Sequence, residues 1–175
     1  MRCLKGAGLL YWLKLLNIYD TGSARRAVGF DTFDSFGPSS NTSETAAVND
    51  YVSEANFKGT SPEEIMTMVK AAGIPDHRCE LIKGDITETA QSYVEKHPGF
   101  RIALLHMDLD LAAPTLAALK AMWPRIVRGG IVVLDEYAIP RWTESDAVDQ
   151  FLADHKLEIK TIPYARTPTA YIRKA

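Results

Sequence analysis

The sequence of 175 residues has little cysteine, no excess of basic residues and no long hydrophobic run. Cys3 and Cys79 are far apart and form no CxxC motif, so we expect reduced thiols rather than a disulfide framework or a cysteine zinc site. The formal net charge is −2, and the scattered lysines and arginines offer no basic stripe for nucleic acid. The apolar stretch Leu9–Leu16 is interrupted by Lys14 and is too short to span a bilayer. We therefore expect a cytoplasmic protein that binds neither nucleic acid nor membrane.

A complete GxGxxG nucleotide-binding motif is also missing. Only Gly6 and Gly8, in the run Lys5-Gly-Ala-Gly, precede the first apolar helix. Glycines at this position could let the backbone approach a nucleotide ligand, although GxG before a helix is more often only a tight turn. By themselves these glycines are weak evidence for a function.

The strongest pattern lies between Arg101 and Ala138. Two apolar runs, Ile102–Leu105 and Ile131–Leu134, are rich in branched side chains and are typical of buried parallel strands. Thr115–Val127 between them has helical periodicity, and Gly129-Gly130 is expected to form the turn back into the sheet. Each run is followed by two carboxylates, namely Asp108 and Asp110 after the first and Asp135 and Glu136 after the second.

These four carboxylates should lie close together. Parallel strands joined by a right-handed crossover end at the same edge of a sheet, and open α/β sheets bind ligands at that edge. Because clustered acids repel one another, a hard divalent cation with oxygen ligands is the simplest group to neutralise them. The pattern therefore predicts a ligand site, with a bound cation as the simplest interpretation.

The rest of the chain predicts a single domain over residues 1–175. Helices and strands alternate, and the last two strands, Glu158–Ile162 and Ala170–Arg173, are expected to form an antiparallel hairpin. We expect a doubly wound α/β sheet of six strands, five parallel and the last antiparallel. Residues 34–60 lack sustained periodicity and predict a long functional loop with one helical turn near Val48–Ala55. The other expected elements are strands at 26–31 and 79–83 and helices over 9–19, 61–72, 88–96 and 144–155.

One element of such a sheet is not found in the sequence. A doubly wound sheet should begin with a strand that leads into the first glycine turn, yet only Met1–Leu4 precede Lys5. This strand would be central, next to the strand that ends before Asp108. The sequence therefore predicts an amino-terminally incomplete sheet, with a gap between the strands that end at Asp31 and before Asp108.

Other polar residues admit two interpretations each. Asp31 ends the expected strand 26–31, the second of a complete sheet, at the position of a ribose-binding acid, or it caps the turn after this strand. Asp85 could bind an adenine amine or cap the next helix. His106 could be a base, although a lone histidine in a strand is usually satisfied inside the fold. Tyr137 and Trp142 could line a pocket or pack under the last helix.

Several of these segments together resemble the macrocin O-methyltransferase (TylF/MycF-like) family. The resemblance covers nearly the whole chain, and its specific part runs from Leu104 to Tyr137. It implies a class I methyltransferase that uses S-adenosylmethionine and Mg²⁺ to methylate a hydroxyl of a sugar-type acceptor, and it leaves a homo-oligomer open. The segments that carry the resemblance are Lys5–Gly8, Val28–Phe36, Leu81–Thr89, Leu104–Leu111, Pro114-Thr115 and Gly129–Tyr137.

The resemblance also implies roles for single residues. Gly6 and Gly8 would belong to the cofactor loop, Asp31 would bind the ribose, and Asp85 would lie beside the adenine. Asp108, Asp135 and Glu136 would be the metal ligands, with Asp108 also the catalytic candidate and Asp110 close to the cofactor. Two positions depart from the family pattern. Glu136 stands where the family usually has Asp, and Ala112 replaces a common Tyr.

Two other functions remain open at this stage. Asp108-Leu-Asp110 after an apolar strand matches the nucleophile and acid pair of haloacid-dehalogenase-type phosphatases, although that motif normally follows the first strand. A chain without its first strand could also be an inactive fragment or a partner-binding remnant. Because the cofactor cleft would lack one wall, we expect residues 1–175 alone to bind S-adenosylmethionine weakly or not at all.

Overall fold

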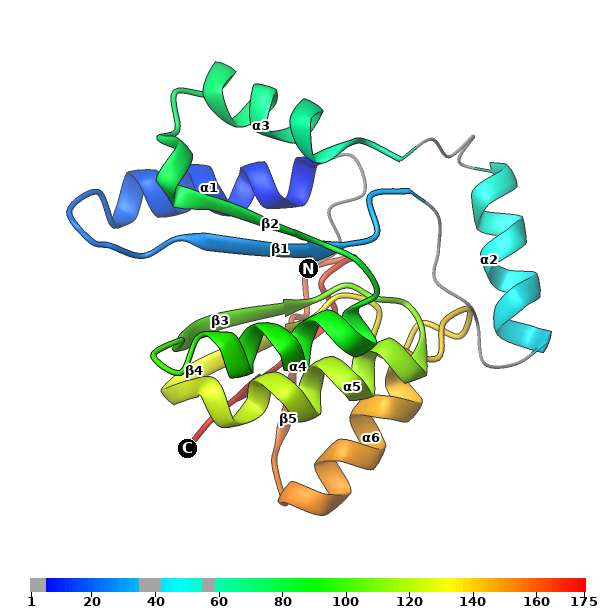
Figure 1. Ribbon diagram of the computed structural model, residues 1–175. Helices are drawn as coiled ribbons and strands as arrows, with labels where there is room; N and C mark the ends of the chain where they lie inside the picture. Colours follow the sequence, from blue (N-terminus) through cyan, green and yellow to red (C-terminus); the bar gives the residue numbers. More distant parts are fainter. Residues whose placement is uncertain (1–5, 35–41, 55–58) are drawn as a thin grey trace.

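The computed structural model describes residues 6–34, 42–54 and 59–175, and its elements alternate along the chain in the expected order (Figure 1). The helices are α1 (Ala7–Tyr19), α2 (Thr42–Glu54), α3 (Pro62–Ala71), α4 (Ile86–Lys96), α5 (Ala112–Met122) and α6 (Glu144–His155), with short 3₁₀ turns η1 (Asp76–Arg78) and η2 (Trp123–Arg125). The strands are β1 (Ala27–Asp31), β2 (Cys79–Lys83), β3 (Ile102–Met107), β4 (Ile126–Leu134), β5 (Ile159–Thr161) and β6 (Ala170–Arg173).

The six strands form two sheets rather than the single sheet that we expected. β1 and β2 pair in parallel, and the other four strands have the order β3-β4-β6-β5. In the larger sheet β3 and β4 are parallel, whereas β6 is antiparallel to both β4 and β5. This arrangement confirms the antiparallel carboxy-terminal hairpin. The division falls between β1 and β3, where the sequence predicted a gap.

Two hydrophobic clusters cover opposite faces of the β1–β2 pair. On one face Phe30 joins the main core, to which α4, α5 and the four-stranded sheet contribute. On the other face Cys79 packs with Leu9 and Leu13 of α1 and with Ile65 of α3. The alternation of side chains along a strand explains how one short strand pair can serve both clusters. No helix among the described ranges is long and apolar enough to cross a membrane.

The start of α3 follows directly from its sequence. The Ser61 hydroxyl accepts a hydrogen bond from the Glu64 backbone N–H at 3.2 Å, and the Glu64 carboxylate accepts one from the Ser61 N–H at 2.8 Å. Pro62 occupies the first helical position, where its missing N–H costs nothing. The predicted helix start is confirmed.

The region before Asp135 differs from the prediction. β4 begins at Ile126, so Gly129 and Gly130 lie within the strand and do not form a turn between helix and strand. The β3–β4 pairing shifts its register between Ile102 and Leu104, which is the mark of a bulge. A Cβ on Gly130 would lie 2.7 Å from the Ile126 side chain and 2.9 Å from the Val127 carbonyl oxygen. The two glycines therefore permit an irregular strand.

The length of α2 and the placement of Gly8 also differ from the prediction. α2 runs from Thr42 to Glu54, much further than the single turn expected near Val48–Ala55, because a polar helix has no apolar period to reveal it. The parts of the expected loop at 35–41 and 55–58 lie outside the described residues. Gly8 belongs to the first turn of α1, so of the two glycines only Gly6 lies in the loop.

Hydrogen bonds from Arg78 hold the loop between α1 and β1 against the start of β2. Its side chain is 5% exposed, and its guanidinium donates to the carbonyl oxygens of Asp20, Thr21 and Arg25 at 2.9–3.2 Å. A planar group with five donors suits several converging carbonyl groups better than any other side chain does.

Replacing Arg78 with methionine should lower the free energy of unfolding by roughly 2–4 kcal/mol, because buried carbonyl groups lose their donors. Urea denaturation followed by circular dichroism measures this change. Lys70→Met is the matched control, since Lys70 is 64% exposed in its ion pair with Asp76 and should contribute less than about 1 kcal/mol. Equal effects of the two substitutions would contradict the role given to Arg78.

Candidate active site

The acidic residues that follow β3 and β4 lie at one edge of the larger sheet. Met107 and Leu134 are partners in the parallel register, and the Asp135 N–H donates to the Met107 carbonyl oxygen at 3.0 Å. Asp108 and Asp135 therefore leave neighbouring strands at the same level. The convergence of these strand ends, predicted from the sequence, is present in the structure.

The carboxylates of this edge influence one another. Burial, together with the negative charges of Asp135 and Asp108, raises the pKa of Glu136 to about 7. Glu136 is therefore a carboxyl group whose charge changes near neutral pH. Burial is the larger cause, and the repulsion between neighbouring carboxylates that the sequence led us to expect acts in the same direction.

The predicted magnesium site is not formed by these side chains. In the part of the chain that the structure describes, no three His, Cys, Asp or Glu side chains are placed so that they could hold a metal ion. One oxygen of Asp135 is also engaged elsewhere, because Oδ1 lies 3.0 Å from His106 Nε2. The assignment of Asp108, Asp135 and Glu136 as a metal-binding set therefore finds no support in this geometry.

His106 is held between two partners. Trp12 Nε1 of α1 donates to His106 Nδ1 at 3.2 Å. Because an indole N–H can only donate, Nδ1 must be the accepting nitrogen, and the proton of the neutral ring then lies on Nε2 and is donated to Asp135. This bonding satisfies His106 inside the fold, as expected for a lone strand histidine.

Glu144, at the start of α6, is a site residue that the sequence analysis missed. Its side chain is 0% exposed, and Oε1 accepts a hydrogen bond from the Glu136 N–H at 3.2 Å. Oε2 is buried and has no hydrogen-bond partner within the described parts of the chain. Burial and, to a smaller extent, the negative charges of Asp110, Asp108 and Asp135 outweigh the opposing hydrogen bond from the Glu136 N–H and raise the pKa of Glu144 to about 8.

A signal for this buried carboxyl was present in the sequence. Glu144, Ala147, Val148 and Phe151 are spaced by three and four residues and are the buried residues of α6. A carboxylate on the apolar stripe of a helix must be buried with it, and a buried carboxylate is either paired or protonated.

The backbone of Asp110 links the two acidic segments. Asp110 is 5% exposed and has a φ of 64°, a left-handed conformation that Asp tolerates better than most residues. Its carbonyl oxygen accepts hydrogen bonds from the N–H groups of Thr143 and Glu144 at 3.0 and 3.1 Å. The loop after β3 and the start of α6 are therefore fixed to each other.

Helix α2 contacts the same region. The Thr143 hydroxyl donates to the carboxylate of Glu44, which is 2% exposed, and accepts from the Ala112 N–H at 2.8 Å. The rings of Tyr51 and Trp142 meet edge to face with centroids 5.6 Å apart. Trp142 thus packs against α2.

Tyr137 follows the other interpretation given for it. Its hydroxyl donates to Asp149 of α6 at 2.8 Å, and its ring packs against the main core. This residue packs under the last helix, as one of its two interpretations required.

The predicted nucleotide-binding acids both make local capping bonds. Asp31, at the end of β1, accepts from the Phe33 N–H at 2.9 Å. Asp85 is the N-cap of α4 and accepts from the N–H and the hydroxyl of Thr87 at 2.9 and 2.8 Å. These bonds confirm the capping interpretation of each residue and leave the nucleotide-binding interpretation as a prediction.

Gly6 is the N-cap of α1 and has a φ of 73°. Among the described residues no side chain caps the first turn of α1, and the N–H groups of this turn have no acceptor within the helix. Such groups favour an anionic or polar ligand.

The chain is similar to known O-methyltransferases over most of its length. The family model described as macrocin-O-methyltransferase (TylF) matches residues 5–173. A curated relative from Streptomyces olivaceus, 8-demethyl-8-(2,3-dimethoxy-alpha-L-rhamnosyl)-tetracenomycin-C 4'-O-methyltransferase, is 30% identical over 77 residues. That match spans 44% of this chain and only 28% of the relative.

Solved structures match over almost the whole chain. The calicheamicin methyltransferase CalS11 has a TM-score of 0.78 at 29% identity, covering 97% of this chain and 68% of that one. Its apo structure, described as a TDP-rhamnose 3'-O-methyltransferase, has a TM-score of 0.72 at 28% identity and covers 98% and 69%. The O-methyltransferase NovP, at 22% identity, has a TM-score of 0.80, covers 98% and 69%, and supports the fold alone.

The raised pKa of Glu144 predicts a pH-dependent stability. The unfolded chain releases this proton near pH 4.5, whereas the folded chain keeps it up to about pH 8. Between these values the folded state binds more protons, so the free energy of unfolding should fall by roughly 2–5 kcal/mol as the pH rises from 4.5 to 8. Glu144→Gln, which keeps an acceptor for the Glu136 N–H, should remove most of this fall.

Urea denaturation at pH 5, 6.5 and 8 provides the measurement. Glu158→Gln is the control, because Glu158 is exposed and its substitution should leave the pH dependence unchanged. A Glu144→Gln protein that loses stability with pH as steeply as the parent does would show that Glu144 is charged in the folded state.

Proposed function

The chain belongs to the macrocin O-methyltransferase family, and on that premise we propose that it transfers a methyl group from S-adenosylmethionine to a hydroxyl group of a sugar. The observation that carries the proposal is the match over residues 5–173 together with the acidic edge at the ends of β3 and β4. Polar groups at the carboxyl ends of parallel strands are where α/β sheets bind nucleotide ligands.

The residues at this edge fit a nucleoside-containing cofactor. Asp31 and Asp85 follow β1 and β2, which are parallel neighbours in register, so both side chains lie at the same end of the smaller sheet. Gly6 is the N-cap of α1, the helix that precedes β1, and makes no side-chain hydrogen bond to the first turn. We assign Asp31 to the ribose hydroxyls, Asp85 to the adenine and Gly6 to the cofactor loop, with Gly8 and Asp110 close to it.

The acceptor that we propose is a rhamnose-type deoxysugar, free as a nucleotide sugar or attached to a natural product. Two related methyltransferases support this class, because both are named for a rhamnose or rhamnosyl group.

Methyl transfer requires the protein to align the acceptor oxygen with the methyl group and to remove one proton. S-adenosylmethionine supplies, when bound, an activated methyl group on a sulfonium sulfur. The acceptor oxygen forms a bond to this carbon as the carbon–sulfur bond breaks, and the hydroxyl proton must leave. We assign the proton to Asp108, which follows β3 at the centre of the acidic edge. We assign no step to a metal ion, because the described side chains form no metal-binding group.

Asp31→Asn should weaken S-adenosylmethionine binding about 10- to 100-fold, since a charged acceptor to the ribose contributes roughly 1.5–3 kcal/mol. Asparagine keeps an oxygen that can accept from the Phe33 N–H, so the turn after β1 should persist. Isothermal titration calorimetry measures the affinity. Asp154→Asn, at an exposed position of α6, is the control and should bind as the parent does. Unchanged affinity in Asp31→Asn would remove Asp31 from the cofactor site.

Asp108→Asn should lower kcat for methyl transfer to TDP-rhamnose about 10²- to 10⁴-fold, because the variant lacks the proton acceptor. Transfer of a radiolabelled methyl group is the measurement, and cofactor affinity should change much less than kcat. Release of inorganic phosphate from phosphate esters by the parent protein, without methyl transfer, would favour a phosphatase and overturn the proposal.

A further inference from the structure

The loop that carries Asp108 contains a strained turn. The Leu111 N–H donates to the Leu109 carbonyl oxygen at 2.6 Å, which closes a three-residue γ-turn around Asp110. Asp110 has a φ of 64°, and a γ-turn with a positive φ at its centre is rare and strained. Strained backbone persists only where the surrounding contacts over-determine it. The contacts that hold this turn therefore bear on the position of Asp108.

Helix α5 begins directly after this turn without a cap of its own. Its N-cap is Leu111, whose side chain makes no capping hydrogen bond, and its first turn contains no acidic residue. Serine, threonine, aspartate and asparagine are preferred at an N-cap because their oxygens accept from the N–H groups of the first turn. The N–H of Ala112, the first residue of α5, must therefore find its acceptor elsewhere in the molecule.

Thr143 and Glu44 supply this acceptor from distant parts of the chain. The Ala112 N–H donates to Thr143 Oγ1 at 2.8 Å, and Glu44 Oε1 lies 3.4 Å from the same nitrogen. The Thr143 hydroxyl in turn donates to the Glu44 carboxylate. Because a hydroxyl has one proton, this bond fixes the rotation of the hydroxyl and directs its lone pairs toward the Ala112 N–H. The helix dipole also favours a carboxylate at the start of α5.

Thr143 holds the strained turn as well as the helix. Its backbone N–H and that of Glu144 donate to the Asp110 carbonyl oxygen at 3.0 and 3.1 Å. Thr143 thus bonds the turn through its backbone and α5 through its side chain. Glu44 belongs to α2 and is 2% exposed, so its carboxylate is buried at this junction. Burial of a carboxylate is costly unless hydrogen bonds compensate for it, which makes the bond between Glu44 and Thr143 important for both residues.

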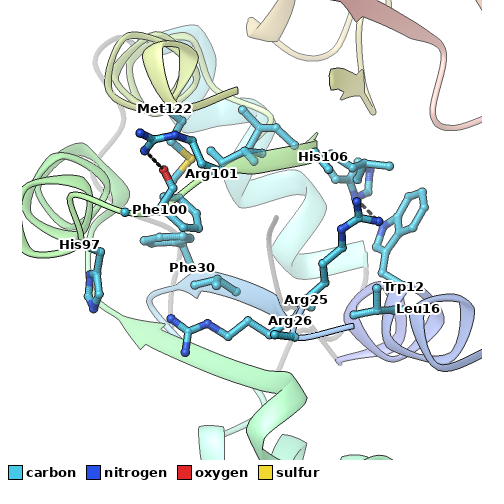
Figure 2. Close-up of a pocket in the computed structure, with 18 of the residues that line it drawn as sticks. Trp12, Leu16, Arg25, Arg26, Phe30, His97, Phe100, Arg101, His106 and Met122 are labelled. Atoms are coloured by element: carbon cyan, nitrogen blue, oxygen red, sulfur yellow. Dashed lines mark hydrogen bonds between the residues drawn. The ribbon is translucent and has the colours of Figure 1, made fainter. Parts of the chain in front are cut away.

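Another helix, α1, reaches the acidic edge in a different setting. Trp12 and His106, which bond each other, both line a cavity of about 930 Å³ between β1 and β3, which we call the intersheet groove (Figure 2). His106 bonds the side chain of Asp135 and so acts at the end of β4. Glu44 and Thr143 do not line this groove. Of these two helix contacts, it is the one from α2 that reaches the loop after β3.

We propose that Glu44 is a positioning residue for Asp108. Its carboxylate fixes the hydroxyl of Thr143. Thr143 in turn caps α5 and bonds the Asp110 carbonyl oxygen, which keeps the strained turn in one conformation. This inference rests on the proposed function, since it takes Asp108 as the group that accepts the proton of the sugar hydroxyl. Proton transfer requires the acceptor within hydrogen-bond distance of that hydroxyl, so a displaced Asp108 should slow methyl transfer and leave cofactor binding nearly unchanged.

Amide hydrogen exchange, followed residue by residue with nuclear magnetic resonance, tests the contacts without any ligand. Glu44→Ala should speed the exchange of the Ala112, Thr143 and Glu144 amides at least tenfold, because these amides bond to the network that Glu44 holds. The amides of β5 and β6 should exchange as in the parent. Asp50→Ala is the matched control, since Asp50 is an exposed acid of the same helix, and it should change none of these rates.

Two substitutions of Thr143 isolate its hydroxyl. Thr143→Val keeps the shape of the side chain and removes the hydroxyl, whereas Thr143→Ser keeps the hydroxyl. In methyl transfer to TDP-rhamnose, Thr143→Val and Glu44→Ala should each lower kcat about 10- to 100-fold, and Thr143→Ser should stay within about threefold of the parent. The double variant should lose about as much as either single variant, because both remove the same hydrogen bond. Asp50→Ala should keep the kcat of the parent.

The affinity for S-adenosylmethionine, measured by isothermal titration calorimetry, separates positioning from a general structural role. It should change less than about threefold in every variant. Equal losses of kcat and cofactor affinity would overturn the inference, as would equal kcat values for Thr143→Val and Thr143→Ser or unchanged amide exchange in Glu44→Ala. If Glu44→Ala does not fold by circular dichroism, the two Thr143 variants decide the outcome.

These outcomes leave the proposed function standing when the parent transfers methyl groups. A parent protein that binds S-adenosylmethionine but transfers no methyl group would overturn the proposed function and with it the role of Asp108. The exchange rates would then still show whether Glu44 holds the turn.

Discussion

The parallel pairing of β3 with β4 is the constraint on which the acidic edge depends. It places the ends of two strands at one level, and both strands are followed by carboxylates. The surrounding structure reduces the resulting repulsion in several ways. His106 donates to Asp135, and the raised pKa values of Glu136 and Glu144 lower the number of negative charges at neutral pH. An acidic cluster can persist in a folded chain when part of it is neutral and part is hydrogen-bonded.

The connection between the two sheets has a different character. Phe30 of β1 meets Tyr93 of α4 edge to face, and the Tyr93 hydroxyl bonds Glu80 of β2. On the other side of the groove Trp12 reaches His106. The sheets are thus held together by side chains from helices rather than by strand pairing. Side-chain contacts of this kind are less cooperative than a hydrogen-bonded ladder, because each is formed independently of the next.

Much of the fold could be predicted from the sequence because its strands are apolar runs and its helices have apolar stripes. The limits of α6, β2 and β6 agree with their patterns, and the capping box of α3 could be identified from four letters. The start of β4 could not, because Val127-Arg128-Gly129 has no strand period and lies in the bulge between Ile126 and Ile131, where the Gly129 N–H donates to the Lys174 carbonyl oxygen. The length of α2 was underestimated because its polar sequence has no apolar period.

The candidate site was predictable to the extent that it follows from strand ends. Asp108 and Asp135 come together because parallel strands share an edge, which needs no knowledge of side-chain positions. Ligand geometry does need that knowledge. The partner of Asp135 is His106, fixed by Trp12 from a distant helix, and no local pattern indicates this contact. Glu144 lies between these two cases. Its spacing with the apolar residues of α6 could be seen in the sequence, but its role as a buried carboxyl group follows only from its burial in the structure.

The position of β6 affects the order in which the molecule can form during synthesis. β6 lies between β4 and β5, although it is the last of the three along the chain. The edge of β4 that pairs with β6 therefore stays unpaired while about 36 more residues are synthesised, which takes several seconds at ordinary rates of translation. β5 emerges first but has no strand to join until Ala170–Arg173 leave the ribosome. The edge that remains unpaired during this time is Ile131–Leu134, the four residues that later pair with β6.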